Sequence, residues 1–540
     1  MTEDGWTDRL VRRGVPEADV AAAREAAAAM AAEIVALPSD PTVPMDAAGF
    51  QALLVQAASE TPAPAPAATA STAEGIEDTA ARLLAGETSS VELTEAALDR
   101  LEAAAAALNA VARLEPDAAL AQARAADARL AAARAAGETP PALLGVPLAH
   151  KDLYAREGWV IEAGSRILAG RRAPSTAASI AALDRAGAVD AGRLNTVEFA
   201  LGPDGRNAHT GPVLNPWDTA RAPGGSSSGS GAAVASGAVA AALGSDTGGS
   251  IRLPAAACGI VGVKPTAGLI GRSGVFPLSG SLDTVGPLAT SVRDAALVVQ
   301  AMIGHDPLDP QSVRRPPTDL MARIEAGLGG LRVGVARAPF FDDLPGDIGG
   351  VLDAALALLT TEGAALSDAV LPGIETANML TVALINAEAA TQHRAWLAER
   401  PMDYGPETRS RLMSGLFLPA FACLAALDGR APMLRAALRG PFREVDVIAT
   451  PVLPFDPPPL EGDDVEVYRA RVRTLGRCTR PFNYLGLPSV VLPCGLSEAG
   501  MPVALQLVGR PFEEATVLRA ARGFERARAF AQDHRPAVTV

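Results

Sequence analysis

The sequence predicts an α/β sandwich, in which helices pack on a central β-sheet and a helical extension precedes this body. Two observations predict this fold class. Helical and strand segments alternate after residue 73, and the strand segments are short apolar runs that fit buried strands. With 540 residues, 49% of them hydrophobic and 20% charged, the chain can bury a large core and does not have the composition of a disordered protein.

The first 60 residues are predicted to be helical. Residues 17–37 are rich in alanine with few helix breakers, and residues 46–60 carry apolar side chains at helical spacing. Residues 61–72 form a proline–alanine stretch typical of a semi-rigid linker, which places a boundary before a main domain at residues 73–540. Because residues 1–60 are too few to form an enzyme, we expect them to serve packing or the formation of a homodimer.

Helices and strands then follow in order along the main domain. Ser89 and Glu92 have the spacing of a capping box and predict a helix to about residue 106, and a second helix is predicted at 117–136. The apolar run 143–150 fits a buried strand that ends at Lys151, and a helix at 179–187 leads into a strand at 188–194. Further strands are predicted at residues 331–335, 445–450 and 489–493, with helices between them.

Composition excludes several classes of function. The net charge of −14 and an aromatic content of 4% argue against a nucleic-acid partner. The four cysteines form no C-x-x-C pair and the five histidines are scattered, so we expect neither a disulfide framework nor a metal site. The longest uncharged run, residues 222–245, is mostly Gly, Ser and Ala and does not predict a membrane span, and the acidic start is unlike a secretory leader. We therefore expect a soluble, cytoplasmic protein.

Lysine is rare in this chain. Of the 47 basic residues only Lys151 and Lys264 are lysine. Where such a chain retains lysine, the position can require a side chain that loses its proton near neutral pH, which arginine cannot do. Chance retention is the alternative for either lysine taken alone.

Two Gly/Ser-rich segments, residues 223–231 and 244–252, flank an apolar run at 232–243 that is predicted to be one helix. A flexible linker would have polar, domain-separating neighbours, and a phosphate-binding loop would carry a lysine in its motif; neither condition is met. The third interpretation is catalytic: residues 247–250 can present backbone N–H groups to an oxyanion beside the hydroxyl of Ser250. Because no histidine motif supplies a base, a neutral Lys151 acting through a serine of the first segment would serve.

Several stretches together resemble the amidase signature family, and they occur in order from about residue 73 to the C-terminus. They are residues 145–152, 215–218, 221–227, 244–252, 262–266, 281–287 and 481–488. The resemblance implies an α/β/α sandwich around a mixed sheet and a Ser–cis-Ser–Lys triad without metal or organic cofactor. It assigns the nucleophile to Ser250, the bridging serine to Ser226 after a cis peptide, and the base to Lys151. It places the oxyanion hole on the backbone N–H groups of Thr247, Gly248, Gly249 and Ser250.

The chain departs from the family pattern at two positions. Ser228 stands where the family usually has glycine, so it either adds a hydroxyl near the triad or is tolerated on the outer side of the loop. Arg193 stands where the family usually has lysine. We expect structural roles for Ser227 and Lys264, and we expect Asp246 and Arg252 to brace the loop by charge-assisted hydrogen bonds.

The resemblance implies hydrolysis of carboxamide C–N bonds of a small molecule through an acyl-serine. Carbamate (urethane) or ester hydrolysis would use the same chemistry. A third interpretation is the glutaminase subunit of a tRNA-dependent amidotransferase, for which the N-terminal extension is unusual. Substrate choice is expected to lie within residues 300–475, where aromatic side chains either line an apolar pocket or belong to the core; the candidates are Phe340, Phe341, Trp396, Tyr404, Phe417 and Phe421.

Overall fold

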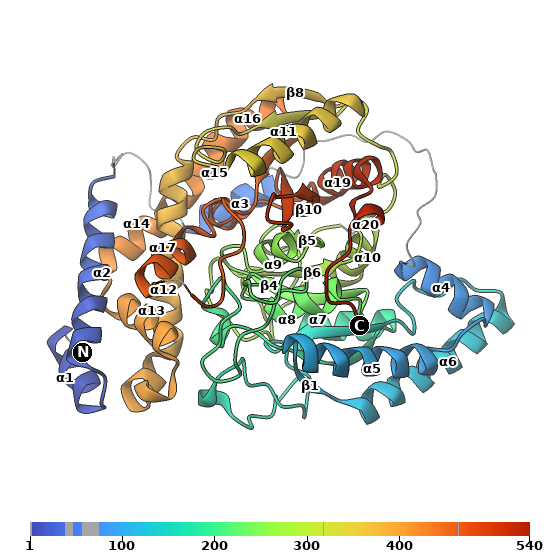
Figure 1. Ribbon diagram of the computed structural model, residues 1–540, viewed down its shortest axis with the longest axis horizontal. Helices are drawn as coiled ribbons and strands as arrows, with labels where there is room; N and C mark the ends of the chain where they lie inside the picture. Colours follow the sequence, from blue (N-terminus) through green and yellow to red (C-terminus); the bar gives the residue numbers. More distant parts are fainter. Residues whose placement is uncertain (1–2, 38–46, 57–74, 317, 463) are drawn as a thin grey trace.

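The computed structural model (Figure 1) describes residues 3–37, 47–56, 75–316, 318–462 and 464–540. Over these residues it contains one 11-stranded mixed sheet in the order β1-β3-β2-β4-β6-β5-β10-β11-β9-β7-β8. The predicted linker at 61–72 lies outside the described residues. The strands are β1 Val111–Leu114, β2 Pro147–Lys151, β3 Val189–Leu194, β4 Ala241–Asp246, β5 Val261–Lys264, β6 Thr284–Ala289, β7 Arg332–Val335, β8 Ala365–Asp368, β9 Val447–Pro451, β10 Ser489–Leu496 and β11 Pro502–Gly509.

Helices cover both faces of the sheet, as the fold class predicted. Alternate residues of β4 show this, because Leu243 joins one buried apolar cluster and Ala242 joins another. The first cluster includes residues of α4 Ile76–Ala85, α7 Ala178–Ala186, α10 Val292–Met302, α11 Gly346–Thr361 and α19 Glu514–Arg528. The second includes residues of α5 Ser90–Leu108, α6 Pro116–Ala136, α8 Ser228–Ala235 and α9 Arg252–Ala257.

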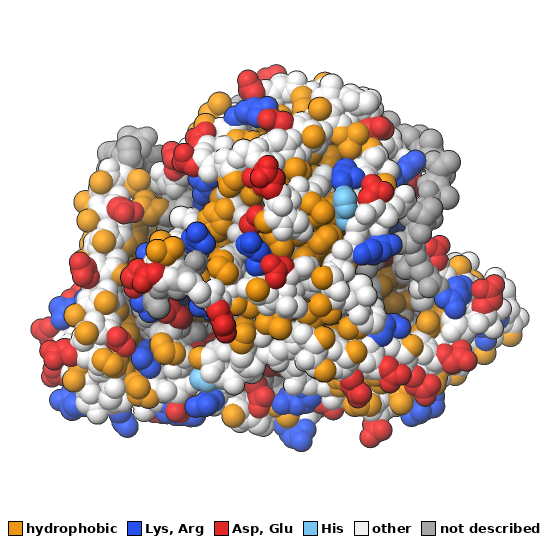
Figure 2. Space-filling model, viewed as in Figure 1, with side chains coloured by type: hydrophobic (Ala, Val, Ile, Leu, Met, Phe, Trp, Pro, Cys, Tyr) orange, Lys and Arg blue, Asp and Glu red, His pale blue; other side chains and the backbone are white. Residues whose placement is uncertain are grey.

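The remaining helices flank the sheet. A long helix, α12 Ile374–Glu399, packs against α13 Pro406–Phe417, α14 Ala420–Asp428 and α18 Arg480–Tyr484. The rest of this group is α15 Arg430–Arg439, α16 Pro441–Glu444, α17 Val465–Thr474 and α20 Phe530–Asp533. The face drawn in Figure 2 shows basic and acidic side chains interspersed. No single helix in the described ranges is long and apolar enough to cross a membrane, although the bent pair Pro406–Phe417 and Ala420–Glu444 passes the same test of length and composition.

The N-terminal helices pack on the main body. They are α1 Glu3–Arg12, α2 Glu17–Val35 and α3 Ala47–Gln56, close to the predicted helical ranges. α2 lies against α13 and α14, and α3 lies against α15. Trp6 and Leu10 share a buried cluster with Leu397, while the ring of Phe50 lies 3.8 Å under the Arg430 guanidinium. The packing role expected of this extension is therefore confirmed, and the homodimer stays a prediction.

The predicted helix boundaries are confirmed where a side chain caps the helix, and they are wrong in a run of small residues without such a cap. The capping box forms, because Ser89 Oγ accepts the Glu92 N–H at 3.1 Å and Glu92 Oε2 accepts the Ser89 N–H at 2.9 Å. The single helix predicted at 232–243 is wrong. α8 ends at Ala235, and the chain turns at Gly237, whose φ of 88° interrupts the helix, before β4 begins. A run of small residues has no apolar periodicity that could have indicated this break.

Candidate active site

Lys151 ends β2, an interior strand of the sheet, and is fully buried. Its Nζ lies 2.7 Å from Ser226 Oγ and 2.9 Å from Ser245 Oγ. The contact with Ser226 is the one that the family resemblance implied. Ser245 is a second partner that the sequence analysis did not assign a role, although it lies within the quoted motif at 244–252.

Burial has a direct electrostatic consequence for this lysine. It lowers the pKa of Lys151 to about 7, against the opposing effect of the charges of Asp283 and Asp246. A large share of this amine is therefore neutral near pH 7, which a base requires. Lys264 behaves similarly, since burial lowers its pKa to about 7, but its Nζ donates to the Pro265 carbonyl at 3.0 Å, consistent with the structural role expected of it.

Ser226 is held by the first Gly/Ser loop. The Gly225–Ser226 peptide is cis, as the resemblance implied. The Ser226 carbonyl accepts the Thr196 hydroxyl at 3.0 Å and the Val197 N–H at 3.3 Å. A Cβ on Gly225 would lie 2.9 Å from the backbone nitrogen of Gly205, so glycine is required for this close approach.

Ser250 lies in the second Gly/Ser loop, which is joined to the first. The Ser250 carbonyl accepts the Ser227 N–H at 3.2 Å, next to the bridging serine in the chain. Ser250 is 8% exposed whereas Lys151 and Ser226 are 0% exposed. Ser250, the expected nucleophile, is thus the least buried member of the proposed triad.

A buried ion pair shapes the second loop. Asp246 and Arg252 are both inaccessible, and Arg252 Nε lies 3.0 Å from Asp246 Oδ2. Burial alone would raise the pKa of Asp246, but Arg252 holds it well below its usual range. Asp246 also accepts the N–H of Gly249 at 2.7 Å, which confirms its bracing role. This bond corrects one expectation: the Gly249 N–H is occupied by a carboxylate, leaving Thr247, Gly248 and Ser250 as the oxyanion candidates.

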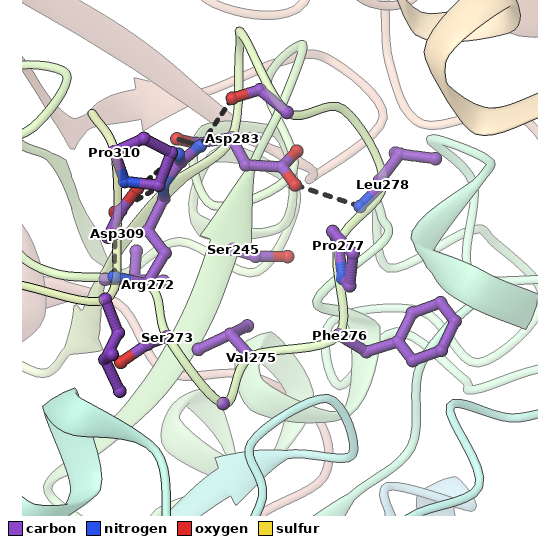
Figure 3. A pocket seen from close by; sticks show the side chains of 14 residues that line it. Ser245, Arg272, Ser273, Val275, Phe276, Pro277, Leu278, Asp283, Asp309 and Pro310 are labelled. Atoms are coloured by element: carbon purple, nitrogen blue, oxygen red, sulfur yellow. Dashed lines mark hydrogen bonds and ion pairs between the residues drawn. The ribbon is translucent and has the colours of Figure 1, made fainter. Parts of the chain in front are cut away.

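A cavity of about 290 Å³ is lined by Ser245 and Asp283 (Figure 3). Ser245 is the hydrogen-bond partner of Lys151, which does not itself line the cavity. Burial raises the pKa of Asp283, whose Oδ1 accepts the Thr247 hydroxyl at 2.6 Å. Other lining residues are Arg272, Ser273, Val275, Phe276, Pro277, Leu278, Leu308, Asp309 and Pro310.

The aromatic candidates do not form one pocket, and none of them lines this cavity. Tyr404 and Phe417 belong to a buried cluster with the N-terminal helices, and the partly buried Trp396 packs against it. Phe340 stacks on Phe482 at 5.6 Å in another cluster. Phe341 is partly buried and lies under Arg337, and Phe421 is 51% exposed. The core interpretation therefore fits the three buried rings, because helices distant in sequence cover them.

The side chains of Arg193 and Ser228, which depart from the family pattern, make no hydrogen bond to Lys151, Ser226 or Ser250 among the described residues. Arg193 Nη1 donates to Asp190 at 2.8 Å and its Nε donates to the Tyr154 carbonyl at 2.9 Å. Ser227 Oγ accepts the Ser245 N–H at 3.2 Å, a structural bond to β4. The Ser228 hydroxyl is buried with no hydrogen-bond partner among the described residues. Within the same residues, no group of three or more His, Cys, Asp or Glu is arranged to hold a metal ion.

Comparison with known proteins identifies the family of the chain. Residues 92–518 match the family profile described as Amidase. The chain is 43% identical over 479 residues to a glutamyl-tRNA(Gln) amidotransferase subunit from Anaeromyxobacter sp. (strain K), covering 84% of this chain and 96% of that protein. It is 40% identical over 469 residues to the corresponding subunit from Chloroflexus aggregans, covering 82% and 94%.

Solved structures give the same family. A protein described as part of a vestigial complex revealing the origins of an s-triazine catabolic enzyme matches with a TM-score of 0.79 and 33% identity, over 86% of this chain and 100% of that chain. Peptide amidase from Stenotrophomonas maltophilia matches at 0.72 and 30%, over 86% and 98%. The glutamyl-tRNA(Gln) amidotransferase subunit from Thermotoga maritima matches at 0.66 and 29%, over 90% and 96%. With the family's motifs, its fold and these relatives all in one chain, the protein belongs to the amidase signature family.

Proposed function

We propose that this protein hydrolyses the C–N bond of a small carboxamide through an acyl-enzyme on Ser250. The observation that carries the proposal is the buried amine of Lys151, 2.7 Å from the hydroxyl of Ser226, in a loop hydrogen-bonded to Ser250. A serine hydroxyl is a weak nucleophile at its ordinary pKa and needs an adjacent base. A neutral lysine relayed through a second serine supplies that base.

The reaction then proceeds in two halves. Neutral Lys151 takes the proton of Ser226, which takes the proton of Ser250 as its oxygen bonds to the carbonyl carbon. The relay runs backward to protonate the leaving nitrogen, and the C–N bond breaks to leave an ester on Ser250. A water molecule, deprotonated by the same relay, attacks that ester and releases the carboxylic acid.

Backbone N–H groups of the second loop stabilise the oxyanion formed in each half. We assign this role to Thr247, Gly248 and Ser250, because the Asp246 carboxylate already accepts the Gly249 N–H. Losing one such donor typically reduces kcat by about 10²–10³. The buried Asp246–Arg252 pair keeps the loop in place before substrate arrives, so little reorganisation is needed during the reaction.

The second candidate is the glutaminase subunit of an amidotransferase. Relatives that carry the name of such a subunit share 38–43% identity with this chain over 81–84% of its length, which supports this candidate more strongly than the sequence motifs alone. Both candidates share the first half of the reaction, in which a primary carboxamide acylates Ser250 and releases ammonia. They differ in whether the ammonia leaves into solvent or passes to a partner subunit.

The test combines a substrate panel with detection of the intermediate. Purified protein is incubated with glutamine, other carboxamides, an anilide, a carbamate and an ester, and the acylated Ser250 peptide is sought by mass spectrometry. We expect turnover of a carboxamide and loss of both signals in Ser250→Ala. Turnover of simple amides by the chain alone supports the hydrolase, whereas turnover of glutamine only, raised by a partner, supports the amidotransferase role. Undiminished activity of Ser250→Ala refutes both.

A further inference from the structure

A side chain of the N-terminal extension contacts the segments that support the second Gly/Ser loop. Phe50 lies on α3, ahead of the residues 92–518 that match the family profile. Its buried ring lies 3.8 Å from the Arg430 guanidinium, where α3 packs against α15 (Figure 1). A Cβ on Gly486 would lie 3.1 Å from Phe50 Cζ, so the ring also lies against the backbone just beyond α18. The extension therefore reaches the C-terminal part of the main domain.

Arg430 joins two separate segments of the chain. Its Nε donates to the Tyr484 carbonyl at 2.8 Å, and its Nη1 donates to the Ser281 carbonyl at 2.9 Å. Arg430 is 5% exposed, and both of these acceptors are uncharged. A buried cation held by uncharged acceptors is costly, and the negative face of an aromatic ring offsets part of that cost. Phe50 therefore helps to hold the guanidinium in the position from which it reaches both carbonyls.

Each of these two segments contacts the second Gly/Ser loop. Asn483 donates from Nδ2 to Asp246 Oδ1 at 2.8 Å and to the Asp246 carbonyl at 3.0 Å. Asp283 Oδ1 accepts the Thr247 hydroxyl at 2.6 Å. In the chain, Asn483 directly precedes one acceptor of the guanidinium, and Asp283 lies just beyond the other. The guanidinium of Arg430 thus ties together the two segments that hold the start of the loop.

We infer that Phe50 is a positioning residue for the proposed reaction: through Arg430, it keeps the second Gly/Ser loop in the conformation that presents Ser250 and the oxyanion donors. This inference rests on the proposed function, because that function gives the loop its part in catalysis. A ring contact, two carbonyls and the side chains of Asn483 and Asp283 connect α3 to the loop. Helix α3 therefore supports the active site in addition to packing on the main domain.

The alternative is that Phe50 only stabilises the folded chain, and kinetic constants separate the two roles. Phe50→Leu removes the ring but keeps an apolar side chain, and each variant is assayed at a temperature at which circular dichroism shows it fully folded. We expect kcat on a carboxamide to fall by about 10- to 100-fold and KM to change by less than about 3-fold, because a displaced loop affects the reacting atoms more than binding. An effect on stability alone leaves both constants of the folded protein unchanged.

Trp6→Leu is the matched control. Trp6 is a buried ring of the same extension, 6% exposed against 4% for Phe50, but it packs in a different apolar cluster with Leu397 of α12. Its replacement should destabilise the protein without a measurable change in the kcat of the folded form. An equal loss of kcat in both variants would mean that any loosening of the extension lowers activity, and the specific role of Phe50 would be wrong.

A double-mutant cycle tests the path through Arg430. Arg430→Gln removes the charge and should itself lower kcat by about 10-fold or more. If the ring acts through the guanidinium, adding Phe50→Leu to Arg430→Gln should lower kcat by less than about 2-fold further. Arg430→Lys takes the place of Arg430→Gln in the cycle if the latter does not fold. Multiplication of the two single effects would show that the two side chains act independently and would overturn the inference.

Hydrogen exchange of the loop gives a readout that needs no turnover. Asp246 accepts the Gly249 N–H at 2.7 Å and the Ile251 N–H at 3.2 Å, so a displaced Asp246 would expose both amides to exchange. Mass spectrometry follows the peptide that spans residues 246–252 in the full-length folded protein. We expect this peptide to exchange about 10-fold faster in Phe50→Leu than in the wild-type protein, and at the wild-type rate in Trp6→Leu.

The outcomes distinguish this inference from the proposed function. If the wild-type protein hydrolyses amides and Phe50→Leu does so with the same kcat, the inference is wrong whatever the loop exchange. A lower kcat with unchanged loop exchange also contradicts it, because the loop is then not displaced. If Phe50→Leu speeds loop exchange but the wild-type protein cleaves no amide, the support of the loop by α3 stands and the proposed hydrolysis fails.

Discussion

The ionisation of Lys151 should set the pH dependence of the reaction. Burial lowers its pKa to about 7, so about half of the amine is neutral at pH 7. An ordinary lysine, with a pKa of about 10.4, would be neutral in only about 1 molecule in 2,500 at that pH. Burial therefore raises the fraction of competent base by about 10³. Activity should therefore be lost as pH falls through 7, because protonated Lys151 cannot accept the proton of Ser226.

The assay is kcat/KM on a neutral carboxamide between pH 5 and 9, so that substrate does not titrate. We expect a plateau above pH 8 and a fall to about 1% of the plateau at pH 5, given a single group with a pKa near 7. Burial also raises the pKa of the neighbouring Asp152 to about 7, so ionisation of this carboxyl is a second possible cause of the loss of kcat/KM below pH 7. The control is Asp152→Asn, which should still lose activity below pH 7 if Lys151 is the cause.

A profile that is flat from pH 5 to 8, or one whose inflection lies near 10, would refute the argument that burial makes Lys151 a base. So would an inflection near 7 that disappears in Asp152→Asn.

Three further predictions concern the relay, the loops and the extension. Lys151→Arg should fold but lose at least about 10³ in kcat, because a guanidinium stays protonated; stopped or continuous ammonia assays check this, and near-normal turnover would reduce Lys151 to an electrostatic role. Ser227→Ala should lower the free energy of unfolding by about 1–3 kcal/mol in urea titrations, because the buried Ser245 N–H loses its acceptor, while the pH profile is unchanged. Phe50→Ala should lower the free energy of unfolding by about 3–5 kcal/mol, because its buried ring packs under Arg430. An unchanged Tm would show that α3 does not stabilise the main domain.

Motif residues could be proposed before the structure because short stretches of the chain resemble those of a known family. The glycine and serine spacing around Ser226 and Ser250 matches the family's motifs. The scarcity of lysine pointed to both Lys151 and Lys264, and the resemblance selected Lys151 as the base. The structure confirms the contact between Lys151 and Ser226 and the cis peptide before it.

Features that depend on distant packing could not be assigned in this way. The aromatic candidates failed because whether a ring lines a cavity depends on helices far away in the chain. Phe417 packs against residues of the N-terminal extension, and Phe276 lines the cavity instead. The run at 232–243 failed because alanine and glycine fit both helix and strand, and only the neighbouring strands β2 and β6 decide that β4 begins at Ala241.

The sequence by itself determined the family and the fold class, and through the family resemblance it indicated the three side chains proposed to react. Both conclusions rest on short segments whose residue types and spacing are specific. Only the tertiary structure decided that Ser245 is a second partner of Lys151 and that Asp246 occupies the Gly249 N–H. The pKa of a lysine and the pairing of an arginine depend on what surrounds them, and segments hundreds of residues apart supply those surroundings.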